Sequence, residues 1–167
     1  MLWLMSGKSI FIIIAFMFST MSSLNLAQQI RVDIKDLSKD ADLIITGKVS
    51  QQTSSWNEDK TRIYTIATIE VEDYIKGNVT GNSVSVKYLG GEVGDVGETY
   101  SHVPTFENNE EVLIFLKKNE SNSDFSVLYG EEGKISLVND SQTGELVTSS
   151  NVRVSSLKTQ IKNYITD

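Results

Sequence analysis

Apolar and polar positions alternate with a period of two along much of this chain, which is typical of strands with one buried face. The first such segment, residues 43–49 (LIITGKV), predicts a strand that runs on to about Trp56. Residues 61–75 carry the longest strand pattern, and residues 83–89 alternate again. Gly and Asn between these last two segments are turn residues, so the two strands are expected to form a hairpin.

The segment 112–116 (VLIFL) is apolar on both faces. This pattern predicts a central strand that is covered on both sides, or a strand of a closed barrel. Shorter strands are expected at residues 125–129, 134–138 and 146–148. The polar stretch 119–124 (NESNSD) has the composition of a hairpin tip.

Helical spacing occurs near both ends of the chain. Apolar residues at Ile30, Ile34, Leu37 and Ala41 predict one or two amphipathic turns within residues 28–41. At the other end, a helix is expected to open after Ser155 and Ser156 as a cap and to dock on the sheet through Leu157, Ile161, Tyr164 and Ile165.

The order of these elements has no alternation of strands with long helices. Together they predict a mainly β fold: a small antiparallel barrel of five to six strands with a short N-terminal helix and a C-terminal helix. Residues 28–167 are expected to form this single domain. The Gly-rich stretch 90–106 is predicted to be a long loop, which makes it the expected binding surface.

Residues 1–27 have the layout of a secretory signal peptide. Lys8 precedes the apolar run 10–18 (IFIIIAFMF), and a small, polar stretch follows it. Cleavage is expected after Ala27, with a cut after Ser22 as an alternative. The rival interpretation is an uncleaved membrane anchor over residues 9–27, which carry no charge. The mature protein is therefore expected to be secreted, to the periplasm or the medium.

Composition narrows the possible chemistry. The chain has no Cys, which excludes thiolate metal sites, thiol nucleophiles, disulfides and a lipid anchor on Cys. The formal net charge of −7 makes nucleic acid and anionic lipid poor partners.

The sequence resembles a group of uncharacterised exported bacterial β-barrel domains over roughly residues 33–138. The resemblance lies in Ala41–Ile44 followed by Gly47–Val49, in Gly90–Gly91, in Pro104–Phe106 leading to 111–116, and in Gly133–Lys134. It implies a barrel similar to the oligonucleotide/oligosaccharide-binding (OB) fold and no assigned activity. Where such domains often carry Gly before the VLIFL strand, this chain has Asn109, the residue that best tolerates a left-handed turn.

Aromatic residues along the strands and the Gly-rich loop are candidates for a binding surface. Stacking on such rings suits sugars or peptides, and the acidic balance argues against bases. The predicted binding residues are Trp56, Tyr88, Tyr100 and His102, and Tyr64 and Tyr74 belong to the same aromatic set. The expected function is a non-catalytic binding or interaction module for an unknown protein, peptide or carbohydrate.

Three alternatives stay open at the sequence level. His102 could serve a hydrolase as its base, although no nucleophile motif surrounds any Ser. Glu92, Asp95 and Glu98 recur every three residues in a flexible segment, a pattern that could bind calcium. A protease-inhibitor-like domain is an analogy from fold alone. No cofactor other than calcium is expected.

Overall fold

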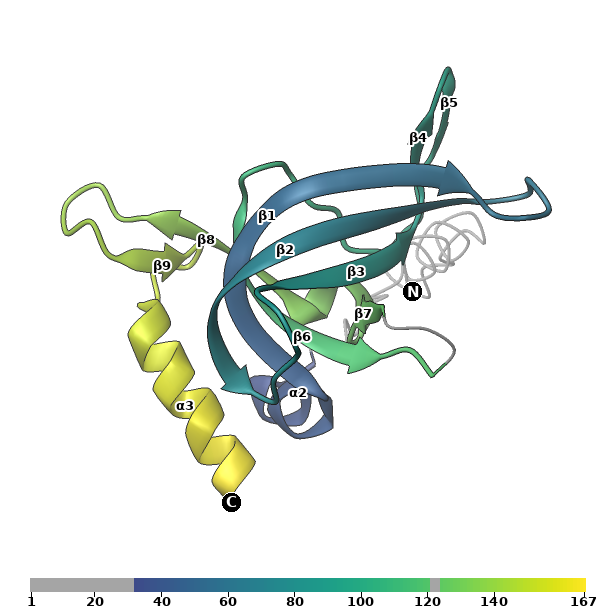
Figure 1. Cartoon of the computed structure of the whole chain (residues 1–167). Coiled ribbons are helices and arrows are strands. Elements are labelled where there is room, and N and C mark those ends of the chain that lie inside the picture. Colours follow the sequence, from purple (N-terminus) through teal and green to yellow (C-terminus); the bar gives the residue numbers. More distant parts are fainter. Residues whose placement is uncertain (1–31, 121–123) are drawn as a thin grey trace, which may run out of the picture. The chain divides into compact units, whose positions relative to one another are not determined.

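Strands dominate the computed structural model, which describes residues 32–120 and 124–167 (Figure 1). The described residues belong to one compact unit, residues 31–167. In chain order the elements are α2 (Ile34–Asp40), β1 (Leu43–Trp56), β2 (Ile63–Lys76), β3 (Ser83–Leu89), β4 (Gly91–Val93), β5 (Val96–Glu98), β6 (Glu111–Lys118), β7 (Phe125–Val127), the 3₁₀ turn η1 (Gly130–Gly133), β8 (Lys134–Asn139), β9 (Leu146–Thr148) and α3 (Val154–Thr166).

Five strands close into a barrel in the order β1-β2-β3-β7-β6, because β6 pairs back onto β1. Neighbouring barrel strands are antiparallel except β3 and β7, which run parallel and meet at Val86 and Phe125. β8 and β9 extend the sheet from β6 beyond the closed ring. The predicted mainly β fold with a small barrel and two helices is therefore confirmed.

The core lies in two layers on either side of the barrel wall. One cluster fills the barrel interior and includes Ile45 and Ile114. The other lies outside the wall, where α2 and α3 cover Leu113 and Phe115. Alternate residues of β6 thus enter different clusters, which explains why VLIFL is apolar on both faces and confirms that prediction.

β1 bends strongly near its middle, between the part that pairs with β6 and residues 50–56. Its register with β2 shifts at three points, one of them between Thr46 and Gly47. A Cβ at Gly47 would overlap the backbone carbonyl of Glu70 on β2, so the close strand contact requires glycine here. Beyond the bend, the last seven residues of β1 continue along β2, which pairs with β3 on its other side, so β1 is the outer strand of a three-stranded sheet here (Figure 1).

Two sequence predictions need correction. Residues 90–106 do not form one irregular loop, because β4 and β5 pair within them as a hairpin with Gly94 and Asp95 at its turn. The C-terminal helix begins at Val154, with Arg153 as its N-cap and no side-chain cap, so Ser155 and Ser156 lie inside the first turn. A β-bridge between Arg153 and Val147 fixes the extended backbone just before the helix, and this tertiary contact replaces the expected serine cap.

Other local expectations can be compared directly. Asn109 has φ 67°, the left-handed conformation expected of the residue before the VLIFL strand. The predicted signal peptide at 1–27, its cleavage site and the start of the domain at 28 lie outside the described residues, so they stay predictions. Within the part of the chain that is described, neither helix has the length and apolar character needed to cross a bilayer.

Candidate functional site

The β4–β5 hairpin begins where the chain leaves β3, and its first strand lies against β1 and β2. A Cβ at Gly91 would overlap the hydroxyl oxygens of Ser54 and Thr65, and Gly91 has φ +127°. The Thr65 hydroxyl donates to the Gly90 carbonyl at 2.6 Å and lies 2.8 Å from the Ser54 hydroxyl. Glycine is therefore what allows the hairpin backbone to approach these hydroxyl groups so closely.

A second set of hydrogen bonds holds the far end of the hairpin. One carboxylate oxygen of Glu98 accepts from the Ile63 N–H at 2.9 Å and from the Tyr100 hydroxyl at 2.8 Å. The Arg62 guanidinium donates to the same hydroxyl at 3.0 Å and lies over the Tyr100 ring. The bond from Ile63, helped by Tyr100 and the Arg62 charge, lowers the pKa of Glu98.

Tyr88 anchors the segment that follows the hairpin. Its hydroxyl donates to the Gln52 side chain at 2.8 Å, and its ring lies 5.4 Å from the Phe106 ring, centroid to centroid. Burial raises the pKa of Tyr88. The ring is therefore held between β1 and the end of the loop, in an orientation fixed at both ends.

The same residues line two adjoining hollows. A cavity of about 220 Å³ lies between β3, the hairpin and Phe106, and Tyr100 forms part of its wall. Another of about 320 Å³ lies on the other side of the loop, with His102 and Pro104 in its lining. Tyr88, Leu89 and Val103 line both. Three of the four predicted binding residues are thus brought together, whereas Trp56 lines neither cavity.

Tyr64 and Lys87 complete the larger cavity. They lie on neighbouring strands, and the Lys87 ammonium is 4.6 Å from the centroid of the Tyr64 ring. Tyr64 was in the predicted aromatic set but not among the four binding residues. Its signal was present in the alternation of residues 61–75, which places Tyr64 opposite the buried Ile63 and Thr65.

His102 occupies an exposed position at the edge of this cavity. Its backbone has φ 62°, its side chain is 85% exposed, and Nδ1 lies 3.2 Å from a Glu131 carboxylate oxygen. This pair supplies a base and an acid, but no hydroxyl group forms a hydrogen bond with His102 in the described residues. The hydrolase alternative therefore stays a prediction without a nucleophile.

The three predicted calcium ligands all lie on the β4–β5 hairpin. Glu92 is on β4, Asp95 is in the turn, and the Glu98 carboxylate already accepts two hydrogen bonds from the protein. Among residues 32–120 and 124–167, no group of three or more His, Cys, Asp or Glu side chains is arranged to hold a metal ion. The calcium site accordingly plays no part in the function proposed below.

A half-buried ion pair between Glu110 and Lys134 holds the end of the loop at Thr105 and Phe106. The Lys134 ammonium lies 2.7 Å from a Glu110 carboxylate oxygen, donates to the Thr105 carbonyl and sits over the Phe106 ring. Burial raises the pKa of Glu110, but bonds from Lys134, Ser136 and a backbone N–H outweigh it, so the net shift is downward. The sequence carried no signal of this pair, since its members come from distant segments.

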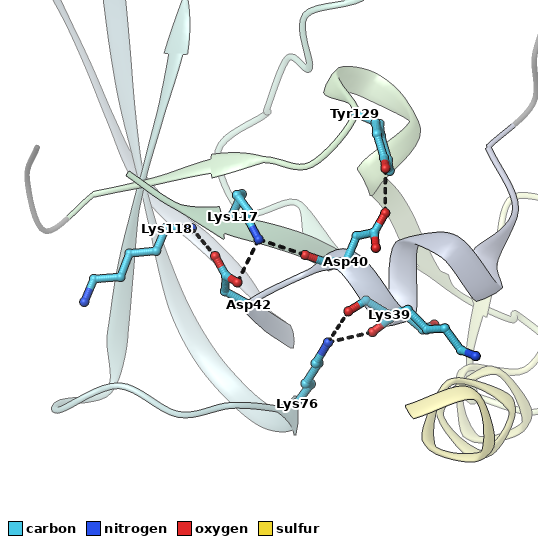
Figure 2. Close-up of polar contacts among 8 residues, drawn as sticks. Lys39, Asp40, Asp42, Lys76, Lys117, Lys118 and Tyr129 are labelled. Carbon is cyan, nitrogen blue, oxygen red and sulfur yellow. Dashed lines mark hydrogen bonds and ion pairs between the residues drawn. The ribbon is translucent and has the colours of Figure 1, made fainter. Parts of the chain in front are cut away.

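A different polar cluster surrounds the C-terminal end of α2 (Figure 2). The Lys76 ammonium donates to the carbonyls of Ser38 and Lys39 at 2.9 and 2.7 Å. These carbonyls belong to the last turn of the helix, where acceptors lack intrahelical partners and carry partial negative charge. Lys76 thus binds the helix end to β2.

Asp42 and Tyr129 extend the same cluster. Asp42 accepts from the Lys117 ammonium at 2.9 Å and from the Lys118 N–H at 3.0 Å, and the latter bond is the main cause of its lowered pKa. The Tyr129 hydroxyl donates to Asp40 at 2.6 Å (Figure 2). Because these donors and acceptors bind one another, we interpret the cluster as a structural clasp for α2.

A hollow of about 820 Å³ lies at the other end of β3, near Gly77 and Ser83. It is lined mainly by the turn after β2 and by the first residues of β3. Its one aromatic residue, Phe125, is buried in the barrel core. None of the predicted site residues lines it. The paired cavities around Tyr88 are therefore the better candidate site.

Comparison with models of known protein families and with curated proteins found no match to this sequence.

Proposed function

We propose that this chain is an exported, non-catalytic binding module of OB-like fold, related to the exported bacterial domains that it resembles. Support for the fold comes from a closed ring of five strands in which β3 and β7, the third and fifth barrel strands along the chain, are parallel. Support for export comes from the sequence of residues 1–27, and the expected address is the periplasm or the medium.

The proposed site is the pair of cavities that share Tyr88, Leu89 and Val103. The observation that carries this proposal is that Tyr88, Tyr100 and His102, three of the four predicted binding residues, line these cavities. In OB folds the face formed by the second and third strands is a common binding surface. Tyr64 on β2 and Lys87 on β3 line the larger cavity, which agrees with that use.

A neutral oligosaccharide fits the chemistry of this site best. Tyrosine rings offer apolar faces to sugar rings, while the Asn119 amide and the Ser126 hydroxyl in the larger cavity are uncharged hydrogen-bonding groups. The net charge of −7 disfavours nucleic acids and other polyanions. A neutral ligand avoids this long-range repulsion.

Titration calorimetry with neutral oligosaccharides of glucose and of N-acetylglucosamine tests the proposal. We expect one of them to bind, and we expect Tyr64→Ala to weaken binding by about threefold to tenfold, the value of one ring contact. Tyr164→Ala is the matched control, because Tyr164 lies on α3 and lines neither cavity. It should leave affinity unchanged.

Equal losses in the two variants would contradict the location of the site. Failure of both sugar series to bind, with the protein folded, would contradict the ligand class. A hydrolytic activity that disappears in His102→Ala without loss of folding would overturn the non-catalytic interpretation. Slowing of a secreted protease would instead favour the inhibitor alternative.

A further inference from the structure

The upper half of β1, residues 50–56, is paired on one side only. Along the other side, the pairing of β1 with β6 ends at Lys48, and Val49 then exchanges hydrogen bonds with Glu110 and Asn109. Beyond Val49, no strand of the described chain pairs with this side of β1. Figure 1 shows this part of β1 as the outer strand of the sheet, with β2 and then β3 beside it.

The direction of each backbone group follows from the register. The Asn57 N–H donates to the Arg62 carbonyl, and the register from Trp56 back to Gln51 is continuous with that bond. Since antiparallel pairs alternate, Thr53 and Ser55 bond to β2, whereas Gln52, Ser54 and Trp56 direct their N–H and C=O groups away from it.

An independent bond confirms this alternation. Ile63 lies opposite Trp56, and its carbonyl accepts from the Gly90 N–H next to β3, so it is not engaged by β1. The exposed edge therefore presents three donors and three acceptors in the spacing of a strand. Asn108, whose side chain bonds to Gln52 at 3.3 Å, marks where this edge begins.

This edge lacks the usual protection against pairing. Natural edge strands carry Lys, Pro, bulges or inward charges that block the approach of another strand. Residues 50–56 (SQQTSSW) contain no charged residue, no Pro and no Gly, and the nearest register shift lies at Ser50, the first of them. A second strand can therefore approach from Gln51 to Trp56.

We propose that two copies of this chain associate through antiparallel pairing of this edge, with the two-fold axis at Ser54. Ser54 then pairs with Ser54 of the partner subunit, and Gln52 pairs with Trp56 of the partner subunit. About six backbone hydrogen bonds join the copies. The β1–β2–β3 sheets of the two molecules then become one continuous six-stranded sheet.

Self-complementarity favours a second copy as the occupant, because about a two-fold axis each outward donor of one copy meets an outward acceptor of the other. The net charge of −7 opposes association over most of the surface. Within the paired segment every residue is uncharged and each faces an uncharged partner. The contact is small, so the dimer is weak and depends on concentration.

Sedimentation equilibrium over a concentration series tests the dimer, and amide hydrogen exchange locates it. We expect exchange at Gln52, Ser54 and Trp56 to slow as the concentration rises. Thr53 and Ser55, already bonded to β2, should change little. A protein that is monomeric at millimolar concentration would overturn the proposal.

Two variant pairs test the register. Ser54→Pro removes the outward N–H and should weaken dimerisation by about tenfold or more, while Ser54→Ala keeps that N–H and should not. Thr53→Lys places a charge beside the axis and should weaken dimerisation similarly, while Thr68→Lys, on β2 between two paired neighbours, should not.

The lysine pair decides the outcome if Ser54→Pro fails to fold. A synthetic SQQTSSW peptide should in addition compete with dimerisation of the wild-type protein. A dimer that persists unchanged in Thr53→Lys, and that the peptide does not disturb, would place the interface elsewhere and overturn the proposal.

Discussion

At the scale of single residues, glycines decide how closely this backbone can pack. Gly47 allows β1 to contact β2 at the bend, and Gly91 allows the hairpin to contact the hydroxyl groups of Ser54 and Thr65. By contrast, Gly94 at the hairpin turn has open space around its Cα. The sequence pattern placed Gly47 in a strand and placed Gly91 and Gly94 in a loop. Which of these glycines meets a neighbouring strand depends on contacts that no local pattern encodes.

Gly91→Ala should therefore destabilise the protein much more than Gly94→Ala. Both have positive φ, which costs alanine about 1–2 kcal/mol. Only Gly91 adds the overlap with Thr65 and Ser54, and we expect a total loss of about 3 kcal/mol or more. Urea unfolding of both variants measures the difference. Equal losses of unfolding free energy in the two variants would show that the hairpin can shift away from β1 and β2 at no cost.

At the scale of elements, the predicted strands agree closely with the structure. β1 runs from Leu43 to Trp56 as expected, and it stays paired with β2 over this length although its register shifts at three points. The β4–β5 hairpin was missed because its strands have only three residues each and carry Gly and Glu rather than β-branched pairs. The start of α3 was misplaced because a β-bridge, not a serine, fixes the preceding residue.

The clasp around α2 allows a test at this scale. Lys76→Met should lower the free energy of unfolding by about 1–2 kcal/mol, because two helix-end carbonyls lose a charged donor. The matched control is Lys39→Met at the same helix end. Figure 2 shows the Lys39 side chain directed away from these carbonyls, so its loss should cost at most about 0.5 kcal/mol. Thermal unfolding of the two variants distinguishes them.

At the scale of the whole molecule, the candidate site was predictable only in part. The sequence placed Tyr88, Tyr100 and His102 near the Gly-rich segment, and the structure brings them around shared cavities. The sequence did not show that Trp56, the last residue of β1, lies outside these cavities. It also did not reveal the ion pair between Glu110 and Lys134. Such contacts depend on barrel closure, which alternation along one strand does not determine.

Acid should destabilise the whole molecule through its bonded carboxylates. The pKa values of Asp42, Glu98, Glu110 and Asp140 are all lowered in the folded state. A lowered folded pKa contributes stability that is present above the ordinary carboxylate pKa and is lost as the pH falls through the folded value. We expect the melting temperature to be steady above about pH 5 and to fall below it.

Glu110→Gln should be less stable than wild type at neutral pH and should show a shallower decline in acid. Glu132→Gln, a change at an acid of η1 that makes no hydrogen bond in the described structure, should leave the decline unchanged. If the melting temperatures of Glu110→Gln and wild type fell with the same slope in acid, the half-buried Glu110 carboxylate would contribute nothing to the acid response.

The parallel contact between β3 and β7 has a consequence for folding. The first three barrel strands can form one after another as hairpins, since each pairs with its neighbour in sequence. Joining Val86 to Phe125 and Leu43 to Leu116 requires the ends of long chain segments to meet, which costs conformational entropy before the contacts repay it. We therefore expect the ring to close late in folding, and until then the sheet has two further open edges.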